Sequence, residues 1–341
     1  MAYTNVTDTT YSWFCPSYKT KNTKTELNHI ISSAKIAEQY GFSSILTPAD
    51  SNCLDPWTIS TYILQNTKNI KPIVALRTGF MEPVYACRMI ATILKVYGPR
   101  LDINIVTGSA KKELLKEGGY LAHQDRYKRT SEFIHIFTNL LKGNDNLTFT
   151  GDYYYCENAH LYPEVESDSL PVVYLAGSSD NAISICEKYK LDYLFFADTL
   201  INTKNRLSKL TTVKSKTMRV NIIVRSSKEE AIKAAINNSE IKVNGKRLAS
   251  LINKTTESIG QKRIAQMVME SDLHDDCLWT GGVGGQTGSV PTLVGTADEI
   301  KKSLEAYKKV GVNHFIVSSI QSIDEIKRIG KQIIQSKVSV G

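Results

Sequence analysis

The sequence of 341 residues predicts an α/β fold, a (β/α)8 TIM barrel with insertions, formed by a single domain over residues 1–341. First, eight short runs rich in β-branched and aromatic residues alternate with amphipathic stretches, which is the pattern of βα units. Second, these runs are almost continuously apolar, as strands are when helices cover a parallel sheet. Third, the length suits one barrel of about 250 residues with added segments.

The predicted strands are spaced so that a helix fits after each of them. They cover residues 11–16, 44–47, 72–76, 102–106, 172–175, 193–196, 219–224 and 314–318. After the first strand, apolar residues recur at helical spacing from Leu27 to Ala37 and stop before Gly41, which predicts a helix with a glycine beyond its C-terminus. Before the last strand, Thr296 and Glu299 have the spacing of a capping box, which predicts a helix start.

Three stretches are longer than a βα unit requires, and we expect them to be insertions. Residues 144–162 contain two β-prone runs around Gly151 and Asp152, which predicts a hairpin. Residues 237–275 are rich in lysine and partly helical in pattern, and residues 277–294 are rich in glycine. Because long segments after barrel strands tend to lie over the catalytic face, we expect the last two to be lids.

The composition excludes several classes of protein. Hydrophobic residues make up 42% of the chain and charged residues 22%, which is ordinary for a globular protein. The net charge is +8, but the basic residues occur singly rather than in clusters, so we expect no nucleic-acid partner. Without a long apolar run or a signal-peptide pattern, the protein is expected to be cytoplasmic, with no membrane partner. The six cysteines lack a CxxC spacing, so we expect reduced thiols and no metal site.

Two polar segments follow predicted strands at points where barrels bind ligands. Residues 104–109 bring the Thr107 hydroxyl and nearby backbone amides to a strand end, although an ordinary turn is the alternative. Residues 177–180 place a glycine and two serines at the start of a predicted helix, which suits a phosphate. A simple N-cap by Ser179 or Asp180 is the alternative reading.

Three other segments contain candidate functional residues. His123 and Tyr127 open a predicted helix and lie about one turn apart, but a packed or surface histidine is the alternative. Cys53 has no basic neighbour that would stabilise a thiolate, so we expect a packed or ligand-facing thiol. Residues 281–288 lack the P-loop and GxGxxG patterns, which favours a lid over a nucleotide-binding loop.

Taken together, these motifs resemble those of the bacterial luciferase-like, flavin-dependent monooxygenases, most closely the alkanesulfonate monooxygenase branch. The resemblance spans residues 13–333 and rests on residues 106–109, the run from His123 to Tyr127, residues 177–180, and Leu278-Trp279 ahead of the glycine-rich run. It implies a luciferase-like TIM barrel that binds reduced FMN and uses O2. It also implies a separate NAD(P)H:flavin reductase that supplies the FMN, and a homodimer or homotetramer.

The resemblance implies roles for individual residues. The FMN-binding set is Thr107, His123, Tyr127, Gly177, Ser178 and Ser179. The catalytic set is Arg219, Cys53 and Asn221, with Cys53 beside the flavin and Arg219 near the reacting centre. The substrate-binding set is Tyr18, Phe196 and Gln286.

Departures from the alkanesulfonate branch bear on the substrate. Tyr18 and Asn221 stand where that branch has histidines, and Gln286 stands where it has an arginine. A tyrosine and a histidine of that branch are likewise replaced by Ile320 and Ser322. Because a buried sulfonate needs cationic donors, these changes favour a neutral or amide-bearing organic substrate. The alternatives are an alkanesulfonate held by Arg219 and insertion lysines, and a non-catalytic flavin-binding accessory protein.

The net charge of +8 suggests a protein partner. Some relatives of this fold act on acyl chains carried by an acyl carrier protein, as in butirosin-type antibiotic biosynthesis, and a basic enzyme would be steered towards such an acidic carrier. The docking face would be formed by Lys242, Lys246, Arg247, Lys254, Lys262 and Arg263. A lysine-rich, solvated surface is the alternative.

Overall fold

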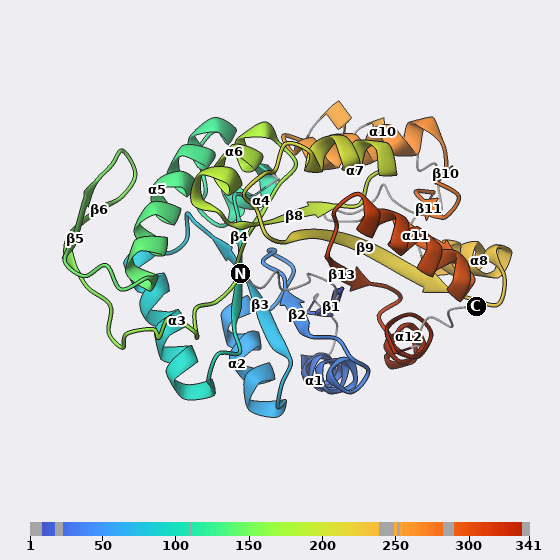
Figure 1. Cartoon of the computed structure of the whole chain (residues 1–341), viewed down its shortest axis with the longest axis horizontal. Helices are drawn as coiled ribbons and strands as arrows, with labels where there is room; N and C mark the ends of the chain where they lie inside the picture. The colour runs from blue at the N-terminus through green and yellow to red at the C-terminus, as the bar shows by residue number, and fades with distance from the viewer. Residues whose placement is uncertain are drawn as a thin grey trace, which may run out of the picture.

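The protein is described from a computed structural model, which covers residues 9–17, 23–108, 111–238, 249–250, 253–254, 256–281 and 290–335. Eight parallel strands close into a barrel, and β9 completes the closure by pairing with both β8 and β13 (Figure 1). These strands are β1 (Thr10–Phe14), β2 (Ser44–Thr47), β3 (Lys71–Arg77), β4 (Asp102–Val106), β7 (Val173–Ala176), β8 (Asp192–Phe196), β9 (Lys216–Val224) and β13 (His314–Ser318). Each lies on one of the eight predicted runs, so the predicted TIM barrel is confirmed.

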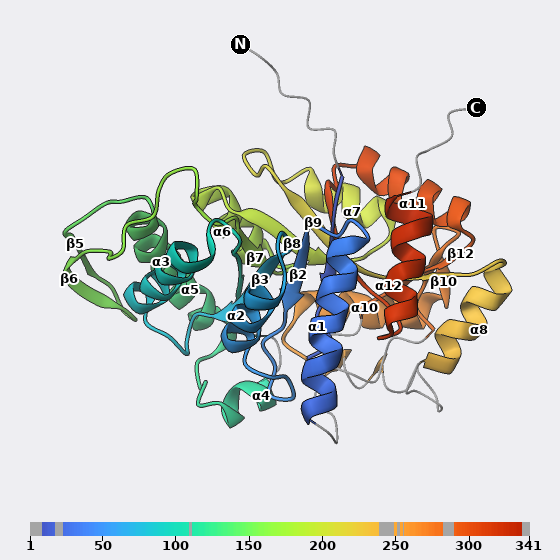
Figure 2. The ribbon, with the colours of Figure 1, turned by 90° about the horizontal axis from the view of Figure 1, so that it is seen from below.

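Helices surround the barrel, as the view turned by 90° also shows (Figure 2). They are α1 (Thr23–Gln39), α2 (Pro56–Asn66), α3 (Pro83–Tyr97), α4 (Lys111–Lys116), α5 (His123–Leu141), α6 (Asp180–Tyr189), α7 (Leu200–Leu207), α8 (Lys228–Asn238), α10 (Ile259–Glu270), α11 (Ala297–Lys309) and α12 (Ile323–Ile329), followed by the π-helical turn η1 (Gly330–Ile334). The predicted capping box is present, because the Thr296 side chain accepts from the Glu299 amide and the Glu299 side chain accepts from the Thr296 amide. Gly41 follows α1 with φ of 89°, a conformation that favours glycine. No helix in the described ranges has the length and apolar character needed to cross a membrane.

The hydrophobic core has two layers. Most of it lies between the strands and the surrounding helices. A second cluster fills the barrel interior. It consists of one inward-facing residue from each of six strands: Phe14, Leu46, Ile73, Tyr174, Leu194 and Ile316. Below this cluster, at the end of the barrel where the strands begin, a cavity of about 590 Å³ is lined by polar residues that include Asp102, Asp192 and His314. The interior cluster therefore separates the two ends of the barrel.

The first predicted insertion forms the expected hairpin. Strands β5 (Leu147–Thr150) and β6 (Tyr155–Ala159) pair antiparallel and extend away from the barrel beside α5 (Figure 1). The Glu132 carboxylate on α5 accepts hydrogen bonds from the amides of Asp152, Tyr153 and Tyr154 at 2.9–3.1 Å. This single carboxylate fixes the turn to the helix.

The other two insertions contain more regular structure than the sequence indicated. The segment 237–275 holds the end of α8, all of α10 and the short strand β10 (Leu273–His274). The segment 277–294 holds β11 (Leu278–Trp279) and most of β12 (Thr292–Gly295), and β12 pairs in parallel with the last four residues of β9, outside the barrel. Residues 282–289, which contain most of the glycine-rich run, lie outside the described ranges, so the lid stays a prediction.

Candidate functional site

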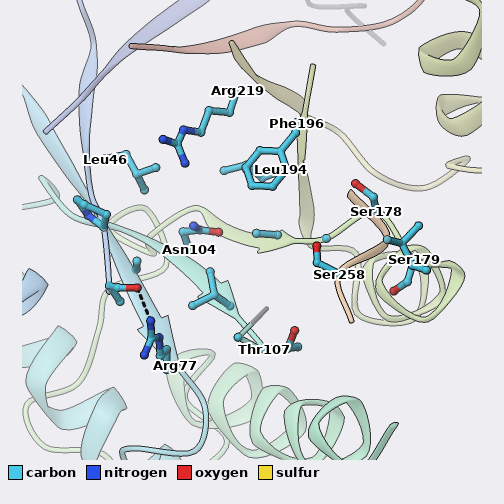
Figure 3. A pocket seen from close by; sticks show the side chains of 18 of the residues that line it. Leu46, Arg77, Asn104, Thr107, Ser178, Ser179, Leu194, Phe196, Arg219 and Ser258 are labelled. Carbon is cyan, nitrogen blue, oxygen red and sulfur yellow. Dashed lines mark hydrogen bonds between the residues drawn. The ribbon is translucent and has the colours of Figure 1, made fainter. Parts of the chain in front are cut away.

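A cavity of about 200 Å³ lies at the end of the barrel where the strands terminate. Figure 3 shows Ser178, Ser179 and Ser258 on one side of it and Leu46, Arg77 and Arg219 on another. Eight residues that the sequence analysis proposed for the site line this one cavity: Thr107, His123, Tyr127, Gly177, Ser178, Ser179, Phe196 and Arg219. Residues separated by more than 100 positions in the chain are thus brought together.

The N-terminus of α6 forms one wall of the cavity. Ser179 is the N-cap, and its hydroxyl oxygen accepts a hydrogen bond from the Ala182 amide at 3.2 Å. The same hydroxyl donates to the Tyr127 hydroxyl oxygen at 2.9 Å. The N-cap reading of residues 177–180 is confirmed for Ser179, which also lines the cavity, while the phosphate site stays a prediction. The helix start adds partial positive charge to this group of hydroxyls.

Gly177 is required for the close packing of this wall. A Cβ atom at this position would lie 2.8 Å from the Ala182 Cβ and 3.2 Å from the Tyr127 hydroxyl oxygen. The strand end therefore approaches α5 and α6 more closely than a larger residue would allow. This contact sets the spacing between the Tyr127 and Ser179 hydroxyls.

His123 lies at the start of α5, next to Tyr127. The two rings pack edge to face with centroids 5.2 Å apart. Burial of the imidazole, reinforced by the nearby Arg126 guanidinium, lowers the pKa of His123. The ring is therefore neutral at pH 7, with one nitrogen that donates and one that accepts a hydrogen bond.

The first turn of α10 forms a second wall beside α6. Ser258 and Ile259 line the cavity, and Ser258 is the N-cap of α10, accepting from the Gln261 amide at 3.3 Å. A Cβ atom on Gly260 would lie 3.0 Å from the Ser178 Oγ, so the two helix starts are in direct contact. The sequence analysis missed Ser258, because it lies in an insertion where no strand marks its position.

Arg219 projects from β9 at the other side of the cavity. Its guanidinium carbon lies 3.8 Å from the centre of the Phe14 ring and 5.8 Å from that of Phe196. Such cation–π contacts orient the planar group without neutralising its charge. Arg77, which also lines the cavity, donates to the Ala49 carbonyl at 2.7 Å and forms an ion pair with Glu117.

Asn104 on β4 is a second cavity residue that the sequence analysis did not select. Its side chain is 4% exposed, and within the described part of the chain its Oδ1 atom has no hydrogen-bond partner. A buried amide oxygen without a partner destabilises the folded protein unless a ligand donates to it. A polar residue inside an otherwise apolar buried strand is the signal that would have identified it.

Of the other four proposed residues, Cys53 and Asn221 are not among those that line the cavity. Cys53 lies near enough for Arg219 and Arg77 to act on it electrostatically, but burial dominates and raises the pKa of its thiol to about 12, so the thiol is protonated. Asn221 lies two residues beyond Arg219, where its Nδ2 donates to the Val290 carbonyl at 3.2 Å and its Oδ1 accepts from the Ser318 hydroxyl. The other two, Tyr18 and Gln286, lie outside the described residues.

These two sides of the cavity suit different parts of one ligand. The side formed by α6 and α10 offers serine and tyrosine hydroxyls and two helix N-termini, the donor set expected for a phosphate. The opposite side combines apolar surface from Phe14, Leu46 and Leu194 with the Asn104 amide oxygen, which suits a planar ring that carries an N–H donor. The residues present therefore fit FMN.

Comparisons with known proteins find relatives in sequence and in fold. A curated relative, the 4-(gamma-L-glutamylamino)butanoyl-[BtrI acyl-carrier protein] monooxygenase BtrO from Niallia circulans, is 28% identical over 303 residues, which cover 88% of each chain. The structure is similar to that of the EDTA monooxygenase EmoA from Chelativorans sp. BNC1, with a TM-score of 0.76 and 15% identity over 96% of this chain and 92% of that one. An F420-dependent secondary alcohol dehydrogenase is similar at a TM-score of 0.71 and 18% identity, over 96% and 98% of the two chains.

Sequence comparison with whole families gives the assignment. The pattern shared by the luciferase-like monooxygenases matches residues 9–314, which include the barrel strands from β1 to β9 and every described residue of the cavity, and end at the first residue of β13. The expectations of an enzyme and of a luciferase-like barrel are both confirmed. The chain belongs to the luciferase-like monooxygenase family.

Proposed function

We propose that this enzyme is a two-component monooxygenase that uses reduced FMN and O2 to hydroxylate a neutral or amide-bearing acyl chain carried by an acyl carrier protein. The family to which it belongs uses a flavin-type cofactor, either FMN or F420. The observation that carries the proposal is the division of the cavity into a phosphate-binding side, made of hydroxyls and helix N-termini, and an inner side of mainly apolar residues beside the Arg219 guanidinium. A separate NAD(P)H:flavin reductase would supply the reduced FMN.

The packing of α10 against Ser178 supports FMN over F420. Ser178, Ser179, Tyr127 and Thr107 would hold the phosphate, with His123 next to them. Gly260 packs directly behind Ser178, so α10 limits the space beyond a phosphate bound there. This suits the terminal phosphate of FMN, whereas the phosphate of F420 carries a further tail. When bound, reduced FMN supplies the electrons with which one atom of O2 enters the substrate and the other becomes water.

The protein's own residues bind, orient and exclude water. Phe14, Leu46, Leu194 and Phe196 provide an apolar wall that limits water access to the inner side. Arg219, held against Phe14, is placed to stabilise negative charge that develops on oxygen during the transfer. The protonated Cys53 thiol lies beside this region and acts as a weak donor rather than a nucleophile.

The charges around the cavity favour a neutral substrate over a sulfonate. The Arg77 charge is offset by Glu117, and Arg219 lies against an aromatic ring. A buried sulfonate would need additional charge-assisted donors. The substrate in the name of the relative BtrO is an amide-bearing acyl group on a carrier protein, which supports the same substrate class here.

The basic net charge of +8 supports an acidic carrier as partner. Lys254 is exposed and Lys262 is partly exposed on the insertion, so both are available for docking. Arg263 is not available, since it pairs with Asp198 and Glu270, and it should be removed from the proposed docking face. Lys242, Lys246 and Arg247 lie outside the described residues. A cytoplasmic homodimer or homotetramer is the expected form.

The test is turnover with FMN, a flavin reductase, NAD(P)H and O2, analysed by intact-protein mass spectrometry. We expect carrier-bound, amide-containing acyl chains to gain the mass of one oxygen atom, and the same acids free in solution to react far more slowly. Sulfite release from short alkanesulfonates would favour the alkanesulfonate alternative and contradict the proposal. Loss of reduced flavin without oxygenated product from any candidate would favour a non-catalytic accessory role.

A further inference from the structure

Asp198 lies just beyond the end of β8, outside the cavity, and it is the centre of a buried polar network. The residue is 2% exposed. Its carboxylate accepts from the Thr199 amide at 2.8 Å and the Asn202 side chain at 3.0 Å. Two guanidinium groups also reach it, Arg206 Nη2 at 3.0 Å and Arg263 Nε at 3.2 Å. A buried carboxylate destabilises a protein unless such a set of hydrogen-bond donors compensates for the lost water.

The two arginines come from different helices. Arg206 lies on α7 and packs over the Phe195 ring, with 5.4 Å between the guanidinium carbon and the ring centre. Arg263 lies on α10 and extends further to Glu270, at 3.2 Å from Arg263 Nη1. In addition, the Tyr307 hydroxyl on α11 donates to the Asp198 carbonyl at 2.7 Å. Asp198 therefore connects α7, α10 and α11 to the end of β8.

The connection to α10 has a direct consequence for the cavity. Arg263 lies one helical turn from Ile259 and Gly260, and these two residues contact the cavity and Ser178. On the same helix, Ile264 and Ala265 belong to a small apolar cluster against which Phe196 packs. Apolar contacts can slide, whereas a charge-assisted hydrogen bond to a buried carboxylate fixes one position. The Asp198–Arg263 pair thus determines where the first turn of α10 lies.

We propose that Asp198 and Arg263 are positioning residues that hold the first turn of α10 against Ser178 and so make the phosphate-binding side of the cavity selective for a terminal phosphate. This inference rests on the proposed use of FMN. Neither side chain contacts the ligand, since both act through Ser258, Ile259 and Gly260. Loss of the pair loosens the side formed by the two helix starts more than the inner side of the cavity, where Phe196 is the residue that packs against α10.

The experiment compares FMN with riboflavin, which has the same ring but no phosphate, by fluorescence titration of the full-length protein. Arg263→Gln removes the charge-assisted bond to Asp198 and so loosens the first turn of α10 on the phosphate-binding side. FMN binding should therefore weaken about tenfold, and riboflavin binding by less than about twofold. Glu270→Gln is the matched control. It removes the partly exposed partner of Arg263 and leaves the bond to Asp198 in place, so both affinities should stay unchanged.

Hydrogen exchange provides a second readout that does not depend on activity. In wild-type protein, FMN should protect the amides of residues 259–261 more than riboflavin does, and Arg263→Gln should abolish this difference. Arg263→Lys, which keeps the charge, should recover part of the FMN affinity.

Three outcomes would count against the inference, and they are distinguishable. If wild-type protein prefers FMN to riboflavin and folded Arg263→Gln keeps that preference, the positioning role is wrong while the proposed function stands. If wild-type protein binds riboflavin as tightly as FMN, the phosphate-binding side itself is wrong, and the proposed cofactor falls with it. An equal loss of both affinities in Arg263→Gln would indicate general structural damage and also count against the positioning role.

Discussion

The guanidinium carbon of Arg219 lies over the aromatic ring of Phe14, 3.8 Å from the ring centre, at the interior of the barrel. The two residues come from β9 and β1, which are not neighbours in the barrel, since β13 lies between them. The contact therefore spans the barrel mouth and fixes a positive charge beside the apolar wall. Its position, rather than its charge alone, makes Arg219 the strongest candidate for a catalytic residue.

Arg219→Ala should reduce turnover much more than flavin binding. We expect a loss of about 100-fold in kcat, the usual effect of removing one group that stabilises developing negative charge, with the Kd for FMN changed by less than about threefold. Steady-state kinetics and fluorescence titration measure the two quantities separately. An equal loss in both would instead place Arg219 in the cofactor-binding set.

Ser179→Ala should weaken FMN binding beyond its effect on stability. The substitution removes an N-cap, which costs about 1 kcal/mol of unfolding free energy, and it removes a hydroxyl from the phosphate-binding side. Ser322→Ala is the matched control, because Ser322 caps α12 through a bond of 3.3 Å to the Glu325 amide and does not line the cavity. Both variants should lose similar stability in urea denaturation, but only Ser179→Ala should lose FMN affinity. A similar loss of affinity in the control would remove Ser179 from the proposed site.

Gly177→Ala should disrupt the site by overpacking. The added methyl group would meet the Ala182 Cβ at 2.8 Å, which real side chains do not tolerate, so α6 must shift away from Tyr127. We expect weaker FMN binding and a stability loss of about 1–3 kcal/mol. The double variant Gly177→Ala, Ala182→Gly restores space at the contact and should recover much of the FMN affinity, although glycine weakens the helix. If the second substitution brings no recovery, the close contact is not what defines the site.

Asn104→Leu should stabilise the ligand-free protein while it weakens flavin binding. The amide oxygen is buried without a partner in the described part of the chain, and replacing it with an apolar group removes the cost of that unmet hydrogen bond, about 1–3 kcal/mol. Thermal or urea denaturation and FMN titration should therefore move in opposite directions. Reduced stability together with unchanged affinity would show that Asn104 has a purely structural role.

His314 should make the protein less stable in acid. Burial lowers the pKa of the His314 imidazole to about 4. Between this value and the usual pKa of about 6.5, the unfolded chain therefore takes up a proton that the folded protein does not. Stability present above pH 6.5 is thus lost as the pH falls towards 4, by about 3 kcal/mol. Urea denaturation of wild type and His314→Asn from pH 7 to pH 4 should show this loss in the wild type alone.

Asp192 lines the same lower cavity and provides a control of opposite sign. Burial of its carboxyl, against a smaller effect of the Ser215 amide, raises its pKa to about 6. The contribution of the Asp192 carboxyl to folding stability is complete below the usual carboxyl pKa of about 4. It is lost as the pH rises through 6. Relative to Asp192→Asn, the wild type should therefore become less stable from pH 4 to pH 6. If the difference in unfolding free energy from wild type changes with pH in the same direction for His314→Asn and Asp192→Asn, both pKa assignments are contradicted.

The sequence predicted the barrel well because buried parallel strands leave a direct signal. Each barrel strand, such as Ser44–Thr47, is a short apolar run bounded by polar residues. Strand β12 is just as buried, but it follows a glycine-rich run and pairs outside the barrel, so neither its spacing nor its surroundings distinguish it from a loop. Its place depends on a long-range contact with the end of β9, which local patterning does not record.

The difference between local sequence pattern and long-range contact also explains which site residues could be predicted. Ser179 and Thr107 were predictable because they directly follow strands whose ends converge. Ser258 reaches the cavity only because Arg263 and the apolar face of α10 dock on β8, a tertiary contact without a local sequence pattern. Asn221 shows the opposite case: it follows a strand residue of the cavity, but its amide is engaged by Val290 and Ser318 at the rim.

The pairing of β9 with β12 also bears on how such enzymes diversify. Because β9 and β13 are neighbours in the barrel, the chain between them is an excursion, a segment that leaves the barrel sheet after Val224 and returns to it at His314. The last four residues of β9 receive β12 without changing which strands close the barrel. Natural selection, or a protein engineer, can therefore rebuild this excursion to admit a new substrate while the strand that carries Arg219 keeps its register.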